Sequence, residues 1–192
     1  MVILMKRLLL SISALVLILT LLTGCNAFME GFNKGLEGAL EKDSEGVQTI
    51  TSDQSQLSVD FPKSWKEEEL NGIATIQMAN MVKEQYMIVI EEAADDFEDG
   101  FTVGDYAEII IENMQTVVSG ATVSSIDDVT IGDNLAAKQV ELSGSVDGIK
   151  CTYFITFAEN DGFFYQFTAW SLPSKYDAAK SVFEDILKSV TF

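Results

Sequence analysis

The chain contains no histidine among its 192 residues. Histidine is the commonest metal ligand and the only side chain whose ordinary pKa lies close to neutral pH. Its absence excludes a Ser-His-Asp triad and argues against a zinc site. No Gly-x-Ser-x-Gly or Ser-x-x-Lys pattern singles out a serine nucleophile either. The sequence therefore offers no catalytic residue, and we expect neither a metal nor another cofactor.

Basic residues are scarce. The chain has 12 Lys and Arg against 30 Asp and Glu, which gives a formal net charge of −18. Such a surface repels phosphate backbones, so nucleic acid is excluded as a partner. Anionic lipid headgroups are disfavoured for the same reason. Any attachment to a membrane therefore needs a hydrophobic anchor.

The chain has only two cysteines, Cys25 and Cys151, which is too few for a disulfide scaffold. Cys151 falls in an alternating apolar stretch that predicts a strand, so a buried and inert thiol is expected there. Cys25 stands in a different setting, directly after a long apolar run.

The first 24 residues have the order of an export signal. Lys6 and Arg7 precede an uncharged apolar run over residues 8–22, which is short for a membrane-spanning helix. The run ends in Leu22, Thr23, Gly24 and Cys25, which resemble the lipobox of bacterial lipoprotein precursors. The resemblance implies removal of residues 1–24 and a diacylglycerol on Cys25, which places the protein at the extracytoplasmic face of the cell membrane. The alternative is an uncleaved anchor helix, and Met5 competes with Met1 as the true start.

Residues 25–55 are expected to form a lipidated tether, with a polar and flexible stretch at its end. An apolar residue recurs at every fourth position, at Phe28, Phe32, Leu36 and Leu40. This spacing suits a helix that binds the membrane surface or a partner. Three glycines and an excess of acid oppose that hypothesis, so a frayed tether is the other interpretation.

Residues 56–192 show a pattern of strands and two helices. Strands are predicted over 57–61, 66–70, 73–79, 86–92, 122–126, 133–140, 138–146, 149–158 and 163–171. Turns are predicted at Asn71-Gly72, Asp147-Gly148 and 160–162 because these residues tolerate positive φ.

Both helices have recognisable ends. Thr102 and Asp105 form a capping box, and Gly120 suits the C-cap of the same helix. Ser174 with Asp177 opens a final helix, whose apolar face comprises Tyr176, Ala179, Val182, Phe183, Ile186, Leu187 and Val190. The order predicts an α+β fold with a largely antiparallel β-sheet flanked by helices.

This order resembles the PsbP/Mog1-like family. Near the start of the domain, Phe61, Pro62 and Trp65 have the aromatic, proline and tryptophan spacing of the family. Near its end, residues 161–165 and the following stretch to Trp170 are also similar to the family. The resemblance implies an α/β/α sandwich and a non-catalytic role in binding or assembly. It transfers no catalytic residue.

The densest aromatic stretch lies within the last predicted strand. Alternation places Phe163, Tyr165 and Phe167 on one face and Phe164 and Trp170 on the other. A sheet covered on both faces would use all of them as core. Phe164 and Trp170 are the alternative candidates for binding a ligand or partner.

Acidic residues are frequent in residues 91–99, but they lack the alternating ligand spacing of an EF-hand loop, so a solvated loop is expected.

The preferred function is a membrane-anchored envelope lipoprotein that binds an envelope protein or a small ligand. The alternatives are a carboxylate-dependent envelope hydrolase and a ligand-capture lipoprotein.

Overall fold

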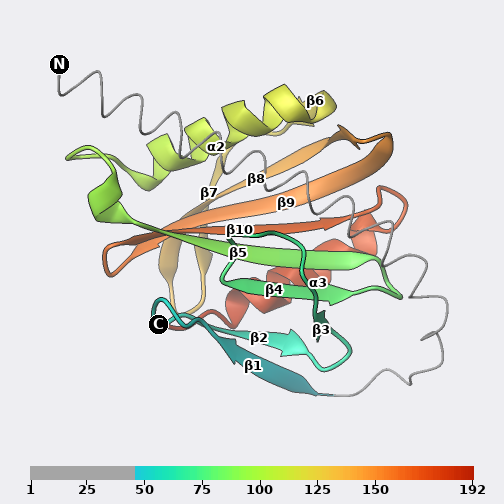
Figure 1. The fold of residues 1–192 in the computed structure, drawn as a ribbon, viewed down its shortest axis with the longest axis horizontal. Coiled ribbons are helices and arrows are strands. Elements are labelled where there is room, and N and C mark those ends of the chain that lie inside the picture. The colour runs from blue at the N-terminus through green and yellow to red at the C-terminus, as the bar shows by residue number, and fades with distance from the viewer. Residues whose placement is uncertain (1–45) are drawn as a thin grey trace.

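An antiparallel β-sheet of eight strands forms the centre of the structure, a computed structural model that describes residues 46–192 (Figure 1). The strands follow the order β3 (Lys66–Glu67), β4 (Ile76–Asn80), β5 (Gln85–Ala93), β10 (Phe163–Ser171), β9 (Ile149–Asn160), β8 (Leu135–Val146) and β6 (Ser119–Val123), and β7 (Asp127–Ile131) also pairs with β8. A separate hairpin joins β1 (Val47–Thr51) to β2 (Ser58–Pro62). The helices are the short η1 (Ala94–Asp96), α2 (Val103–Val117) and α3 (Tyr176–Lys188). The α+β prediction with an antiparallel sheet is confirmed.

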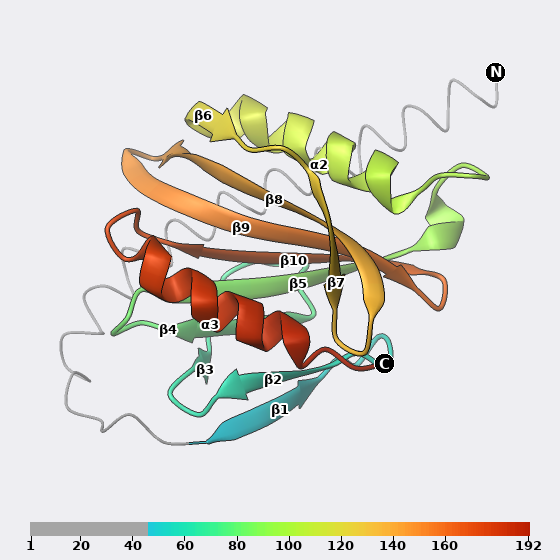
Figure 2. The same cartoon turned by 180° about the vertical axis from the view of Figure 1, so that it is seen from behind.

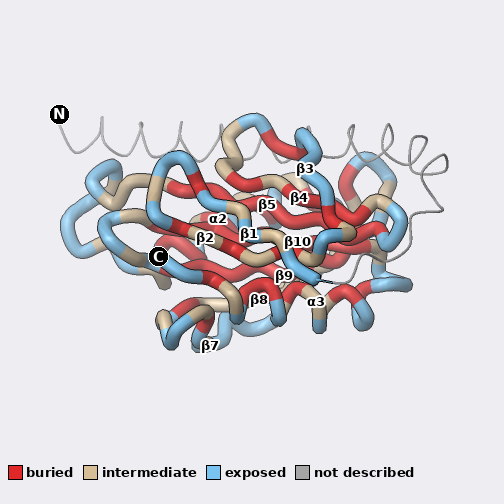
Figure 3. The backbone as a smooth tube through the Cα atoms, turned by 90° about the horizontal axis from the view of Figure 1, so that it is seen from below, coloured by how far each residue is buried: buried red, intermediate tan, exposed pale blue. Residues whose placement is uncertain are grey.

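The sheet is covered on both faces. Helix α2 lies on one face, and α3 with the β1–β2 hairpin lies on the other, as the two opposite views show (Figures 1 and 2). Burial follows this arrangement, with the central strands buried and the connecting loops exposed (Figure 3). Two hydrophobic cores result, one on each side of the sheet. This explains why the sequences of β5, β9 and β10 are almost continuously apolar.

The residues that carry the family resemblance pack together in the core on the α3 side. The Phe61 and Trp65 rings lie 5.7 Å apart, and Trp65 meets Phe183 of α3 edge-on at 6.3 Å. All three side chains are almost completely buried. The spacing of Phe61 and Trp65 in the sequence therefore serves the packing of this core.

Helix α2 begins where the capping box predicts. The Asp105 N–H donates to Thr102 Oγ1 at 3.2 Å, and the Thr102 N–H donates to Asp105 Oδ2 at 2.9 Å. The predicted end is wrong, because the C-cap is Val118 and Gly120 lies in β6. Gly120 has a φ of 66° and sits at the irregularity where β6 shifts register on β8. Its positive φ therefore serves a bulge in a strand.

Helix α3 has the predicted apolar face, but Ser174 does not cap it. The N-cap position is Lys175, which makes no capping hydrogen bond through its side chain. The apolar side of the helix is buried at Tyr176, Ala179, Phe183, Ile186 and Leu187, with Val182 partly buried, and Val190 is buried just beyond the end of the helix. Packing on the sheet, instead of a cap, determines where this helix lies.

Two of the three predicted turns are confirmed. Asp147 and Gly148 have φ of 52° and 83°, and Asp161 and Gly162 have φ of 47° and 79°. The prediction at Asn71-Gly72 is wrong, since neither residue has positive φ and a longer loop joins β3 to β4.

A side chain stabilises that longer loop. Gln77 Oε1 accepts hydrogen bonds from the backbone N–H groups of Leu70 and Asn71, both at 2.7 Å. The loop thus satisfies its donors without a tight hairpin, and β3 is shorter than predicted.

The region between the two helices differs in its strand division. The predicted strands over 133–140 and 138–146 are one continuous strand, β8, and β7 was not predicted. β7 pairs with the first part of β8 and β6 with the last part, so one long strand serves two short partners. Such a division depends on pairing, which periodicity along the chain does not contain.

The domain includes residues before the predicted boundary at residue 56. Strand β1 falls inside the stretch assigned to the tether, and it pairs along its whole length with β2. Ile50 of β1 packs against the core on the α3 side, which accounts for its place in the domain. The predictions for residues 1–45, including Cys25 and the apolar stripe from Phe28 to Leu40, lie outside the described residues. Within residues 46–192, no helix has the length and apolar character needed to cross a membrane.

Candidate functional site

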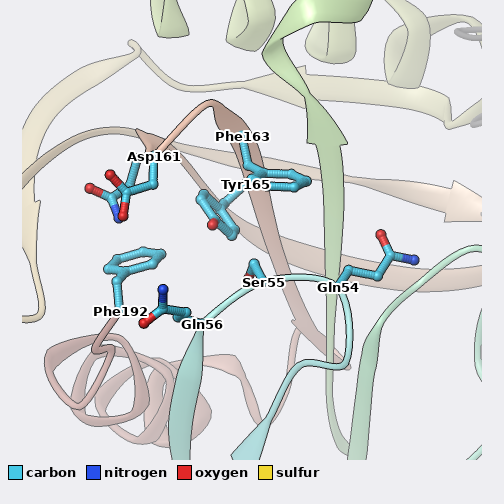
Figure 4. A pocket seen from close by; sticks show the side chains of 8 residues that line it. Gln54, Ser55, Gln56, Asp161, Phe163, Tyr165 and Phe192 are labelled. Atoms are coloured by element: carbon cyan, nitrogen blue, oxygen red, sulfur yellow. The ribbon is translucent and has the colours of Figure 1, made fainter.

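A pocket of about 300 Å³ opens at one end of the sheet, where three segments meet (Figure 4). The loop between β1 and β2 contributes Gln54, Ser55 and Gln56, and the other walls come from the β9–β10 turn with the start of β10 and from the segment after α3. These segments lie far apart in the sequence. The pocket is therefore a product of the tertiary fold.

The loop over residues 52–57 is held in a fixed shape. The Ser52 N–H donates to the Leu57 carbonyl at 2.9 Å, which closes the loop. The hydroxyl of Ser52 accepts from the Gln54 N–H at 3.0 Å, and the hydroxyl of Ser55 accepts from the Leu57 N–H at 3.1 Å. Local hydrogen bonds of this kind are why serines favour turns. They position the Gln54 and Gln56 side chains at the pocket.

The β9–β10 turn supplies Asn160 and Asp161. Asp161 and Gly162 both have left-handed backbone, which Asp and Gly adopt more readily than other residues. The Gly162 carbonyl accepts a hydrogen bond from the Ala94 N–H at 2.7 Å, which ties the turn to the end of β5. The Asp161 side chain is thus held at the rim of the pocket on a fixed turn.

Three aromatic rings line the pocket. Tyr165 is almost fully buried, and its ring lies 6.2 Å from Phe163 and 5.0 Å from Phe192. Phe192 is the exposed member, at 38%. Its position follows from Thr191, whose N–H and carbonyl both bond to Ser58, at 3.0 and 2.8 Å. The segment after α3 is therefore fastened beside the loop that forms the opposite wall.

The electrostatic surroundings of Tyr165 are negative. Burial raises the pKa of its hydroxyl, the charges of Glu91 and Asp161 raise it further, and a hydrogen bond with Ser55 acts in the opposite direction. The hydroxyl is consequently protonated at neutral pH. No lysine or arginine lines this pocket among the described residues.

Glu91 lies beside Tyr165, outside the residues that line the pocket. The two residues pair across β5 and β10, and Glu91 is 8% exposed. The Thr75 hydroxyl donates to Glu91 Oε1 at 2.6 Å, while Oε2 is buried without a hydrogen bond from the described residues. A carboxylate held here directs a negative potential toward the rings of the pocket.

Phe164 and Trp170, the residues proposed from sequence as binding candidates, lie on the opposite side of the sheet. Phe164 is 1% exposed and packs against Phe97, Phe101 and Tyr106 at 5.1 to 5.6 Å. Trp170 is 9% exposed and stacks on Tyr86 at 5.3 Å. Neither lines the pocket, and a binding role for them stays a prediction.

The aromatic stretch nonetheless contains pocket residues, since Phe163 and Tyr165 alternate with Phe164 along β10. Sequence reasoning missed the rest of the wall. The polar stretch at Gln54 to Gln56, just before the predicted strand at 57–61, was the only local signal for it. Nothing in the sequence indicated that Phe192 joins the site.

Other predicted features have definite places. Cys151 is buried on β9, as expected from its strand. The acidic stretch at residues 91–99 places carboxylates on both faces of the sheet. Glu91 accepts a hydrogen bond from the Thr75 hydroxyl on one face, and Glu92 accepts one from the Tyr106 hydroxyl, at 2.6 Å, on the other. A second pocket, about 330 Å³ in volume, is lined by three glutamates at 67–69 together with Asn71, Gly72 and Gln77. Among residues 46–192 no cluster of three acidic or cysteine side chains has the geometry to hold a metal ion.

Comparison with known proteins shows the fold. The structure is similar to cyanobacterial PsbP (CyanoP) from Synechocystis sp. PCC 6803, with a TM-score of 0.59 and 13% identity, covering 79% of this chain and 94% of CyanoP. It is similar to LpqN of Mycobacterium tuberculosis, which is involved in cell envelope biogenesis, with a TM-score of 0.56 and 13% identity over 78% of this chain and 92% of LpqN.

PA94 of Pseudomonas aeruginosa is a third similar structure. Its TM-score is 0.50 at 12% identity, and the match covers 76% of this chain and 96% of PA94. Neither protein-family models nor curated proteins match the sequence. The domain therefore has a PsbP-like fold, in agreement with the resemblance seen in the sequence.

Proposed function

We propose that the protein is a lipid-anchored module of the cell envelope that binds a partner or ligand without catalysis, and that the pocket beside Tyr165 is its binding site. The composition of the pocket wall is the observation that carries this proposal. Aromatic rings supply contact area, side-chain amides supply hydrogen bonds, and the surrounding loops are fixed by their own hydrogen bonds. Pre-formed sites with a few convergent polar groups are typical of ligand binding.

The same wall gives little support to a hydrolase. Among the described residues that line the pocket, Asp161 is the only one with a side-chain carboxylate, whereas glycoside hydrolysis uses two Asp or Glu residues at a defined separation. The Ser55 hydroxyl accepts a backbone N–H and has no histidine to activate it. The raised pKa of Tyr165 makes it a poor base at neutral pH. These features favour binding.

The anchor is proposed from the sequence. Leu22, Thr23, Gly24 and Cys25 resemble a lipobox, and a lipid on Cys25 would hold the acidic protein at a membrane without any basic patch. The structural similarity to LpqN, a protein involved in cell envelope biogenesis, is consistent with that location.

Metabolic labelling with palmitate tests the anchor. The Cys25→Ala variant is expected to lose the label and to keep its signal segment, whereas Cys151→Ala keeps the label because its thiol is buried in the domain. Undiminished labelling of Cys25→Ala would overturn the lipoprotein proposal.

Photocrosslinking in intact cells tests the pocket. A photoreactive residue in place of Gln56, an exposed side chain on the pocket wall, is expected to give defined adducts. The same residue in place of Lys150, which is exposed at the far end of β9, is the matched control. Identical adducts from both positions, or adducts from Lys150 alone, would contradict a binding role for this pocket.

A further inference from the structure

We infer that the pocket beside Tyr165 binds an organic ammonium group, either the primary amine of a lysine-type side chain or the quaternary amine of a choline-type headgroup. The inference rests on the proposed function, because it assigns a ligand chemistry to the same pocket. It is carried by the rings that line the pocket and by the sign of the charges around them.

Three aromatic rings line the pocket, with Tyr165 buried between the others and Phe192 exposed. Phe163 and Phe192 stand on either side of Tyr165, with ring planes tilted by 46° and 62° to its plane (Figure 4). The face of an aromatic ring is negative, so a cation placed within about 6 Å of the ring centroid is attracted. Rings inclined to one another can contact one rounded cation together, and quaternary ammonium groups are recognised in this way.

The charges select against anions. Asp161 lines the pocket and Glu91 is buried beside Tyr165 on the neighbouring strand, and both charges act on the Tyr165 hydroxyl. No basic side chain offsets them among the described lining residues. The net charge of −18 adds a long-range attraction for cations. A neutral sugar could contact the same rings and amides and donate a hydrogen bond to Asp161, but it would gain no charge attraction from these carboxylates.

The polar side chains of the pocket interact differently with a primary and a quaternary ammonium group. The side-chain carbonyls of Gln54, Gln56 and Asn160 can accept hydrogen bonds from a primary ammonium, which has three donors. A quaternary ammonium has no donor and would depend on the rings and on Asp161. The affinities of the two probes therefore report which source the pocket prefers.

Isothermal titration of the full mature chain with three probes tests the inference. The probes are choline, Nα-acetyl-lysine amide, whose side-chain ammonium is free, and 3,3-dimethylbutan-1-ol, which has the shape of choline without its charge. At least one of the two ammonium probes should bind several-fold more tightly than the neutral alcohol, with an affinity that falls as salt rises. Tighter binding of choline indicates a headgroup, and tighter binding of the lysine amide indicates a protein or peptide amine. Equal binding of all three probes, or tighter binding of the alcohol, would overturn the inference.

Variants locate the binding. Phe192→Leu keeps an apolar side chain at an exposed position but removes the aromatic face, and it should weaken ammonium binding about two- to five-fold, as expected for a cation–π contact at an exposed site. Asp161→Asn keeps a residue that tolerates the left-handed backbone and removes one charge. Its effect should be similar and should vanish at high salt.

Asp147→Asn is the matched control for Asp161→Asn. Asp147 occupies the same position in the β8–β9 turn, also with positive φ, at the opposite end of β9 from the pocket. This variant should leave affinity unchanged. Equal losses in Asp147→Asn and Asp161→Asn would refute a local role for Asp161. If Gln56 still crosslinks a partner while no ammonium probe binds, the ammonium inference fails and the proposed binding function stands.

Discussion

Gly132 lies in direct contact with Val190. A Cβ atom on Gly132 would come within 2.1 Å of the Val190 carbonyl oxygen, and the Gly132 N–H donates to the Leu187 carbonyl at 3.0 Å. The turn between β7 and β8 thereby fastens the end of α3. The segment beyond it carries Phe192 to the pocket, so this contact links the core to the proposed site.

Gly132→Ala should destabilise the protein by more than Gly148→Ala. Both glycines have positive φ, which costs other residues roughly 1–2 kcal/mol, but nothing lies within 4 Å of a Cβ on Gly148. The difference between the two variants, measured by urea unfolding, isolates the contact with Val190. Equal losses of stability would mean that the backbone at Val190 moves aside at no cost.

Phe183→Ala should cost about 3–5 kcal/mol of unfolding free energy, as truncation of a buried aromatic does. The side chain is fully buried between Trp65 and Phe154, at ring distances of 6.3 Å to each. The exposed neighbour Ser181 provides a control, and Ser181→Ala should change stability by less than about 0.5 kcal/mol. A loss below about 1 kcal/mol for Phe183→Ala would contradict the packing of α3 on the sheet.

The capping box of α2 should contribute a pH-dependent term to stability. Hydrogen bonds from the Thr102 hydroxyl and then from its backbone N–H lower the pKa of Asp105 below its ordinary value of 3.8. A folded-state pKa below the unfolded one means that the ionised carboxylate stabilises the fold above about pH 3.8. This stability is lost as the pH falls through the lower, folded-state value.

Asp105→Asn should therefore reduce the loss of unfolding free energy that occurs as the pH falls, when unfolding is measured between pH 2 and 6. Asp99→Asn, which removes an exposed charge before the helix, is the control. Parallel pH profiles for the wild type and Asp105→Asn would show that the box contributes nothing through ionisation.

Calcium should bind to residues 91–99 no more tightly than roughly millimolar, as in weak extracellular sites. Glu91 and Glu92 point to opposite faces of the sheet, where Thr75 and Tyr106 hydroxyls already bond to them, so the two cannot share one ion. Calorimetric titration of the protein with calcium measures this. Micromolar affinity that disappears on neutralising Asp95 and Asp99 would show that the loop is a calcium site.

Sequence reasoning succeeded where the cause of a structure lies within a few residues. The Asp147-Gly148 and Asp161-Gly162 turns follow from the tolerance of these residues for positive φ. The start of α2 follows from Thr102 and Asp105, which bond to each other. Sequence reasoning failed at Asn71-Gly72, where hydrogen bonds to the side chain of Gln77 stabilise a longer loop.

By itself the sequence determined the fold class, the apolar face of α3 and the burial of β10, because alternation and helical spacing leave few ways to bury that much apolar surface. Only the tertiary structure decided how β8 is shared between β6 and β7, and which residues line the pocket. Gln54, Asp161 and Phe192 belong to separate segments, and no local pattern relates them. Three interactions bring them together: the pairing of β1 with β2, the hydrogen bond that joins the β9–β10 turn to Ala94, and the two backbone hydrogen bonds between Ser58 and Thr191. Contacts between distant segments therefore create the proposed site.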